Sequence, residues 1–180
     1  MPQDHFRSSG FIESGIIQTG DDKPINIRSL PPFLRTLLVA DGTVTKSLEA
    51  FFWEKVNVET VAQNDHELGQ NIESIGANTG DHVLKREVTL CGETTEKIYA
   101  YATSYLKLET LDPEVKDSLL DGKIGIGELL REIGLETYRE IIDIGEAKEM
   151  IYRTYIIHIG GHPIIQITEH FPLDCYTSKS

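Results

Sequence analysis

The chain of 180 residues is 39% hydrophobic and 26% charged, which suits one soluble domain with a single substantial core. Its formal net charge of −12, with no basic run to oppose it, predicts that the protein binds neither nucleic acid nor an anionic membrane surface. The first residues lack the apolar core of a signal peptide, and no apolar run is long enough to cross a bilayer. We therefore expect a cytoplasmic protein.

Three segments of the chain differ in pattern and predict an arm, one domain and a tail. Residues 1–28 are polar and weakly patterned, which predicts an N-terminal arm with at most one short strand. Residues 29–173 carry the periodic apolar pattern of a folded domain. We expect residues 174–180 to form a flexible tail.

Two short helices are predicted at the start of this domain. Ser29 and the prolines that follow it are typical of a helix start, and the apolar spacing predicts a helix over residues 31–40. A second helix is predicted from Thr43, whose hydroxyl can cap it. Its first turn places backbone N–H groups without helical acceptors beside Lys46. That arrangement is either an anion site or an ordinary capped turn at the surface.

Alternating side chains predict strands in the next part of the chain. Residues 56–61 alternate as a strand, and residues 62–81 form a polar excursion. Residues 82–91 and 98–106 then alternate as two antiparallel strands joined by a hairpin. One face of the strand at 98–106 carries small side chains such as Ser104, which leave room beside the strand at 82–91.

The strand at 82–91 carries a charged side chain on an apolar face. Arg86 alternates with Leu84, Val88 and Leu90, so all four share one side of the sheet. An arginine on the core side of a strand cannot lose its charge and must find a carboxylate or a phosphate there. We interpret Arg86 as an anchor for an anion.

The second half of the chain predicts a helix, a glycine loop and three more strands. The helix covers about 112–120. The glycine loop at 122–127 is either a segment whose backbone approaches a ligand closely or a mobile connector. Residues 138–145, 150–159 and 163–171 alternate as strands. We therefore predict an α+β fold, a single domain with a mainly antiparallel sheet and helices packed on one face.

A second charged side chain faces the predicted core from the last strand. Glu169 shares its side with Ile165, Ile167 and other apolar residues. It either forms a buried ion pair with Arg86 or lines a closed pocket for a small anion. Arg153 is either another inward cation or a side chain that extends to the surface.

Other kinds of site lack support in the sequence. His158 and His162 are separated by a glycine turn and would not converge on a metal ion, so no metal is predicted. No Gly-x-Ser-x-Gly sequence exists, so hydrolase chemistry has no motif. Cys91 and Cys175 are too few for a disulfide framework, and we interpret them as structural thiols.

Four short motifs occur in this chain in the same order as in a known family. They are the stretches at 37–46, 85–87, 122–127 and 167–172, which contain Asp-Gly-Thr-Val-Thr-Lys, Lys-Arg-Glu, Gly-Lys-Ile-Gly-Ile-Gly and Ile-Thr-Glu-x-Phe-Pro. With them the chain resembles the chorismate lyases (chorismate–pyruvate lyases), in the branch formerly catalogued as a domain of unknown function. The resemblance covers about residues 30–173 and implies a sheet with helices on one face and an occluded ligand pocket.

The resemblance also implies roles for particular residues. The family's carboxylate-binding arginine falls on Arg86, and its pocket acid falls on Glu169, at the ring hydroxyl and ether side of the substrate. Apolar contacts to the ligand fall on Val44 and Ile126, with Gly127 beside the latter. The other residues expected to bind the substrate are Thr45, Lys46, Lys85 and Arg153.

The expected function follows from the same resemblance. Chorismate would lose pyruvate to give 4-hydroxybenzoate, a precursor of compounds such as quinones, without a cofactor. The expected partners are this substrate and its product, with no nucleic acid and no membrane, and a homodimer is possible. The alternative is a non-catalytic domain of the same fold that binds a small aromatic acid as an effector, as in some bacterial transcription regulators.

Overall fold

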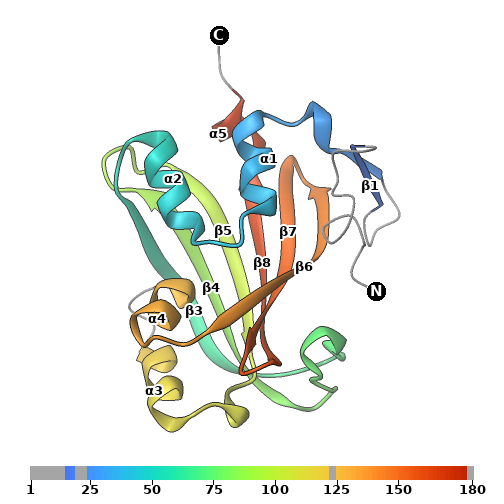
Figure 1. Cartoon of the computed structure of the whole chain (residues 1–180), viewed down its shortest axis with the longest axis vertical. Helices are drawn as coiled ribbons and strands as arrows, with labels where there is room; N and C mark the ends of the chain where they lie inside the picture. The colour runs from blue at the N-terminus through green and yellow to red at the C-terminus, as the bar shows by residue number, and fades with distance from the viewer. Residues whose placement is uncertain (1–14, 19–23, 122–124, 178–180) are drawn as a thin grey trace.

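An antiparallel sheet of six strands organises the computed structural model, which describes residues 15–18, 24–121 and 125–177 (Figure 1). The strands lie in the order β3-β4-β5-β8-β7-β6, so the two hairpin groups meet where β5 pairs with β8. The predicted antiparallel sheet is confirmed. The strands are β3 (Val56–Glu67), β4 (His82–Gly92), β5 (Ile98–Leu106), β6 (Thr137–Ala147), β7 (Met150–Ile159) and β8 (His162–Pro172).

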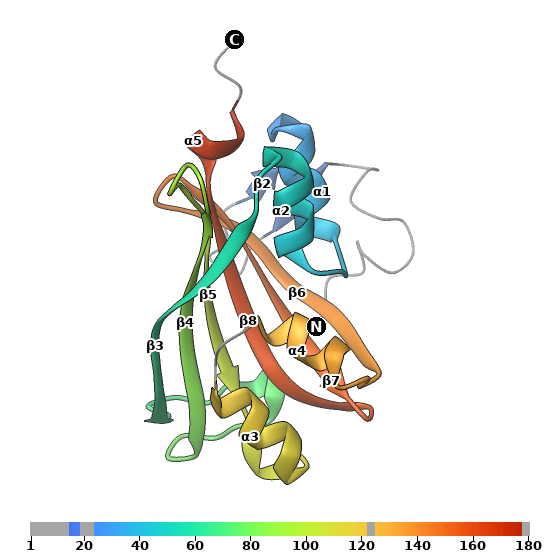
Figure 2. The ribbon, with the colours of Figure 1, turned by 90° about the vertical axis from the view of Figure 1, so that its left-hand side faces the viewer.

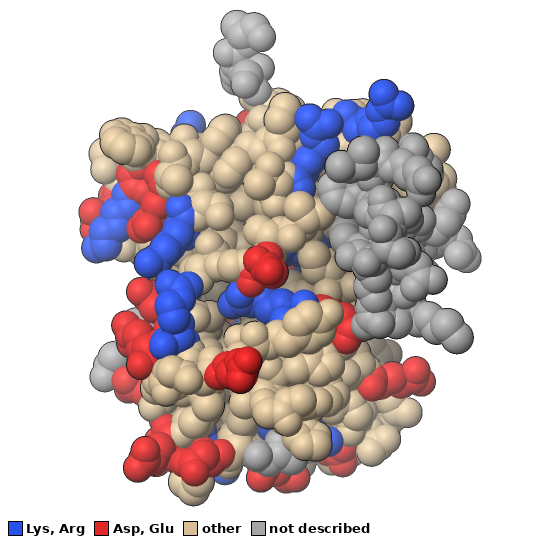
Figure 3. Space-filling view, in the orientation of Figure 1, with Lys and Arg blue, Asp and Glu red and all other residues tan. Residues whose placement is uncertain are grey.

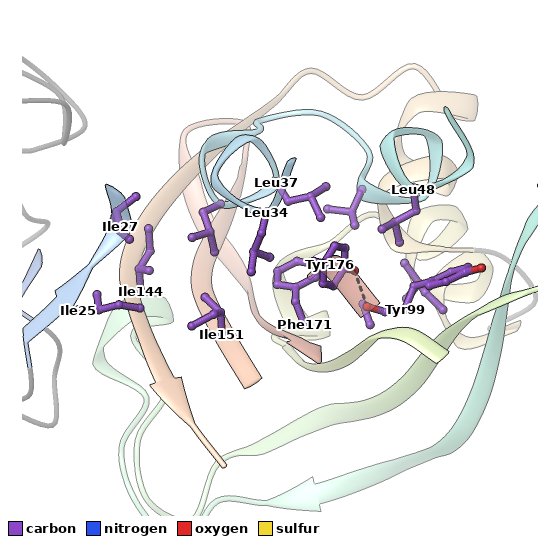
Figure 4. Packing of buried hydrophobic residues seen from close by; sticks show 14 of the residues in the cluster. Ile25, Ile27, Leu34, Leu37, Leu48, Tyr99, Ile144, Ile151, Phe171 and Tyr176 are labelled. Atoms are coloured by element: carbon purple, nitrogen blue, oxygen red, sulfur yellow. Dashed lines mark hydrogen bonds between the residues drawn. The ribbon is translucent and has the colours of Figure 1, made fainter. Parts of the chain in front are cut away.

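The longer helices pack against one face of this sheet, as predicted (Figure 2). Prolines begin α1 and α3, where the missing N–H of proline costs no hydrogen bond. The pair α1 and α2 and the pair α3 and α4 each bury apolar side chains against the strands. Figure 4 shows this for Leu34 and Leu37, which lie above Ile151 and Phe171. The helices are α1 (Pro32–Val39), α2 (Val44–Phe52), α3 (Pro113–Asp121), α4 (Ile126–Glu132) and α5 (Leu173–Tyr176).

The segment expected as a polar excursion contributes to the sheet and to a second, smaller core. Strand β3 runs on to Glu67 instead of ending at residue 61, with a bulge between Thr60 and Ala62. It lies at the edge of the sheet and is largely exposed, so its sequence needs no apolar alternation. The residues after it, including η3 (Glu73–Ile75), bury Ile75 against the opposite face of the sheet.

The described parts of the expected arm and tail pack against the domain. The short strands β1 (Ile16–Gln18) and β2 (Pro24–Asn26) pair with each other, and Ile17 and Ile25 are buried with Ile144 of β6. In the segment expected as a tail, α5 buries Tyr176, which donates a hydrogen bond to the Tyr99 carbonyl at 2.6 Å. Its ring packs among other aromatic rings, which the local sequence does not reveal.

Two short 3-10 turns complete the described elements, namely η2 (Ile27–Ser29) and η4 (Leu108–Thr110). Residues 1–14, part of the expected arm, and Gly122, Lys123 and Ile124 of the glycine loop lie outside the described residues. None of the described helices is long and apolar enough to span a membrane.

Candidate functional site

A pocket lies on the helical face of the sheet, between the strands and the starts of α2 and α4. All six strands contribute side chains to its lining. The empty space measures about 590 Å³, which includes solvent at the mouth. Closure of the pocket around a ligand stays a prediction.

Arg86 stands in this pocket, on the inner face of β4. It is 2% exposed, and it donates a hydrogen bond to Thr60 Oγ1 on the neighbouring strand at 3.2 Å. Burial lowers the pKa of the Arg86 guanidinium, but an arginine stays protonated in proteins. The pocket therefore contains a buried positive charge, as the alternation along β4 predicted.

Glu169 lines the same pocket from β8, and its ion-pair partner is Arg153 rather than Arg86. Arg153 Nε donates to Glu169 Oε2 at 2.8 Å, across the two adjacent strands β7 and β8. The hydroxyl of Tyr155 donates to Glu169 Oε1 at 3.0 Å. Burial, aided by the charge of Glu169, raises the pKa of Tyr155 well above its usual range. Tyr155 is therefore a neutral hydrogen-bond donor to a carboxylate.

Arg153 is an inward cation that lies behind Glu169 and outside the pocket lining. It is 1% exposed, and its Nη1 donates to the carbonyls of Leu37 at 2.6 Å and Ala40 at 2.7 Å. These carbonyls belong to the C-terminal end of α1, which favours a cation. The sequence left open whether the Arg153 side chain faces the core or extends to the surface. The structure selects the buried position, where Arg153 holds Glu169 and the end of α1.

Strand β5 separates Arg86 from Glu169 with small side chains. Arg86 pairs in register with Ser104, and Glu169 pairs in register with Ala102, so β5 lies between them. Two strand spacings amount to about 10 Å. Both small residues line the pocket, as the sequence suggested. The gap above them can hold a flat ring with one end at the arginine and the other at the glutamate.

The helix starts form the opposite wall of the pocket. Val44 and Thr45 line it from the first turn of α2, and Ile126 and Gly127 line it from the first turn of α4. Val44 and Ile126 are only 5% and 7% exposed, so they present apolar surface to the space above the sheet. The structure thus brings these residues together with Arg86 and Glu169.

Two lysines expected near the substrate lie elsewhere. Lys46 is exposed on α2 and does not line the pocket. Lys85 neighbours Arg86 on β4 and therefore points to the opposite face, where it pairs with Glu87 at 2.6 Å. Hydrogen bonding to Glu87 raises the pKa of Lys85. The alternation that places Arg86 inward thus places Lys85 outward.

Arg139 and Tyr155 line the pocket but were not among the residues expected to bind a ligand. Arg139 lies on β6, and its Nη1 donates to the carbonyl of Asp41 in the loop between α1 and α2. The sequence signal that could have identified Arg139 is its spacing of two residues from Ile141, which places both side chains on the same face of β6. A bulge between Ile141 and Asp143 shifts that alternation further along the strand.

Within the described residues, no three His, Cys, Asp or Glu side chains lie close enough together to hold a metal ion. That the protein works without a metal or cofactor stays a prediction.

Comparison with known proteins shows similarity in sequence and, separately, in fold. The chorismate pyruvate-lyase of Mycobacterium tuberculosis is 27% identical over 163 residues, covering 81% of this chain and 82% of that protein. The protein MJ0807 of Methanocaldococcus jannaschii is 34% identical over 154 residues, covering 76% of each chain. The crystal structure of the effector domain of PhnF from Mycobacterium smegmatis has a TM-score of 0.56 at 17% identity, covering 76% of this chain and 91% of that chain.

The PhnF effector domain resembles this chain in fold alone. The amino-acid sequence, in contrast, also matches the model of a protein family. The family model described as chorismate pyruvate-lyase, Rv2949c-like, matches residues 38–178, which is well over half of the chain. The chain belongs to the Rv2949c-like chorismate pyruvate-lyase family.

Proposed function

We propose that this protein is a chorismate lyase that converts chorismate to 4-hydroxybenzoate and pyruvate. The observation that carries the proposal is the placement of Arg86 and Glu169 on either side of a gap floored by Ala102 and Ser104. A ring with a carboxylate at one end and a hydroxyl at the other matches this arrangement of a cation and an acceptor. Relatives named chorismate pyruvate-lyase support the same reaction.

The proposed reaction needs no external electron donor or acceptor. The ether bond between the ring and the enolpyruvyl group breaks, and the ring carbon that bears the hydroxyl loses a proton. The enolpyruvyl fragment takes up a proton and becomes pyruvate, so atoms and electrons balance. Formation of the aromatic ring supplies the driving force. The protein has to bind the substrate, orient it and manage the proton.

Arg86 is proposed to bind the ring carboxylate. A guanidinium can hold a carboxylate by two parallel hydrogen bonds, and such pairs are strong where water is excluded. The bond to Thr60 Oγ1 orients the side chain before the ligand arrives. This contact fixes the end of the ring that stays unchanged in the reaction.

Glu169 is proposed to accept a hydrogen bond from the ring hydroxyl, beside the ether bond that breaks. Each carboxylate oxygen has two lone pairs, and the bonds from Arg153 and Tyr155 use one on each. A further acceptor position therefore remains on each oxygen. The position of Glu169 also suits transfer of a proton at this end of the substrate.

The test is incubation of the purified protein with chorismate, following pyruvate and 4-hydroxybenzoate together. We expect equimolar release of both. In Arg86→Gln we expect kcat/KM to fall at least about 30-fold, because truncating one partner of a buried charge pair costs about 2–5 kcal/mol. Lys85→Gln is the matched control, since its side chain points to the other face and should leave turnover unchanged.

Two other outcomes would change the conclusion. Absence of turnover by the wild type, together with saturable binding of 4-hydroxybenzoate, would indicate a non-catalytic effector-binding domain. Full activity in Arg86→Gln would remove the proposed carboxylate contact. Melting curves of all variants show whether a loss of activity reflects a loss of fold.

A further inference from the structure

The proposed substrate carries two carboxylates, and Arg86 accounts for one of them. The second belongs to the enolpyruvyl group. Of the described residues that line the pocket, the positively charged ones are Arg86 and Arg139. The same lining includes the carboxylates of Glu128 and Glu169, which repel an anion. A dianionic ligand therefore needs positive charge near the second carboxylate.

Arg139 lines the pocket from β6, on the far side of Glu169 from Arg86. The strands run β5-β8-β7-β6, so Arg86 on β4 and Arg139 on β6 lie on opposite sides of Glu169. Arg139 pairs in register with Ile157, which lies four residues along β7 from Arg153, the register partner of Glu169, so only the long side chain of Arg139 brings its charge toward the pocket. The enolpyruvyl ether is attached next to the ring carbon that bears the hydroxyl. If Glu169 holds that hydroxyl, the second carboxylate extends from the Glu169 side of the ring.

The guanidinium of Arg139 still has a donor to offer. Its Nη1 donates to the Asp41 carbonyl, which fixes one edge of the group. Its Nε is covered by protein and has no hydrogen-bond partner among the described residues. Because this Nε is covered, a ligand carboxylate would bind the Nη2 side of the guanidinium, which lies beside Gly127 at the pocket.

The start of α4 leaves room for this guanidinium. A Cβ atom on Gly127 would lie 2.7 Å from Arg139 Nη2, so a side chain there would displace it. Basic side chains are visible at the centre of the face in Figure 3, where β6 passes below the loop between α1 and α2. Acidic side chains lie beside these basic ones in Figure 3, so the positive charge there is local in a protein with a formal net charge of −12.

We propose that Arg139 binds the enolpyruvyl carboxylate and so distinguishes the substrate from its aromatic product. The proposal rests on the proposed lyase function. The aromatic product has lost that carboxylate, which leaves with pyruvate. Arg139 therefore strengthens substrate binding without strengthening retention of 4-hydroxybenzoate, whereas Arg86 binds both.

The test compares two stable ligands by titration calorimetry, so that it does not depend on turnover. One is 4-hydroxybenzoate. The other is 3-(carboxymethoxy)-4-hydroxybenzoate. Its second carboxylate is joined to the ether oxygen through one methylene group, and its ring is already aromatic, so it cannot undergo the elimination. In Arg139→Gln we expect the dianion to bind at least about tenfold more weakly and 4-hydroxybenzoate to change by less than about threefold. Arg139→Lys should recover part of the loss.

Arg131→Gln is the matched control, because Arg131 donates to Thr43 Oγ1 near the same mouth but does not line the pocket. We expect it to bind both ligands as the wild type does. Equal weakening of both ligands in Arg139→Gln, or no weakening of either, overturns the proposal. If the wild type binds the dianion selectively through Arg139 but does not turn over chorismate, the lyase function fails while the assignment of Arg139 stands.

Discussion

Arg153 and Glu169 form a buried ion pair across the adjacent strands β7 and β8, with 2.8 Å between Nε and Oε2. Arg153 also donates to the carbonyls of Leu37 and Ala40, so the pair joins the sheet to the end of α1. Arg86 lines the pocket from β4. One arginine thus supports the fold of the site, and another is the residue that we propose binds the ligand.

Breaking this pair should destabilise the protein strongly. Arg153→Met would leave the Glu169 charge without its cation and two carbonyls without their donor, and we expect a loss of about 3–5 kcal/mol in the free energy of unfolding. Urea unfolding measures it. The exposed pair between Lys55 and Glu93 serves as the control, and Lys55→Met should cost at most about 1 kcal/mol.

The double variant Arg153→Met/Glu169→Leu checks the cause of that loss. Removing both charges leaves no uncompensated buried carboxylate, so it should unfold at a higher urea concentration than Arg153→Met alone. A double variant as unstable as the sum of the two single variants would show that the two side chains act independently.

A methyl group at Gly127 should disturb ligand binding without disturbing the fold. The added Cβ would lie 2.7 Å from Arg139 Nη2, and the end of a flexible side chain can move away at little cost. We expect Gly127→Ala to keep the melting temperature and to bind the dianion more weakly, as Arg139→Gln does. Gly125→Ala is the control, since its Cβ would meet only Val58 Cγ2 at an ordinary 3.7 Å. Wild-type affinity in Gly127→Ala would contradict the expectation.

A larger side chain on the floor of the pocket should exclude the ring. Ser104 is 3% exposed and pairs in register with Arg86, so Ser104→Val would fill space beside the anchor. We expect the affinity for 4-hydroxybenzoate to fall at least about tenfold, measured by titration calorimetry. Thr103→Val changes the opposite face of the same strand and should leave the affinity unchanged. Similar losses in both variants would indicate distortion of β5 instead.

Acid should destabilise the protein through Glu54, which follows α2 and does not line the pocket. The hydrogen bond from Tyr99, with further bonds from Thr94 and Thr95, lowers the pKa of Glu54 from 4.5 to about 2. A carboxylate with a lowered pKa stabilises the fold above pH 4.5, and this contribution is lost as the pH falls toward 2.

The variant Glu54→Gln removes that titration. Its stability should lie below the wild type at neutral pH, and the difference should shrink between about pH 4.5 and 2. Unfolding curves recorded across this range measure the difference. Glu93→Gln, which alters an exposed pair, should run parallel to the wild type. A constant difference at every pH would show that the carboxylate charge of Glu54 is unimportant.

Local patterns in the sequence were sufficient for the elements and for their inward faces. Period-two alternation placed Arg86, Glu169 and the small residues of β5 on the side that the helices cover, because neighbouring residues of a strand point to opposite faces. The same rule places Lys85 outside. The prolines before α1 and the threonine before α2 predicted where these helices start, although Thr43 makes no capping hydrogen bond and its hydroxyl accepts from Arg131 instead. The pocket itself needs strands that meet only through long-range pairing.

The tertiary structure decided which of these inward residues meet. The sequence analysis offered Arg86 as the partner of Glu169 and left open whether Arg153 faces inward, but the strand order β5-β8-β7 makes Arg153 the neighbour of Glu169. Likewise, Arg139 reaches the pocket because β6 lies beside β7 and because Gly127, from a distant helix, leaves it space. Alternation is set by the backbone within one strand, whereas pairing between strands depends on how the whole chain closes its core.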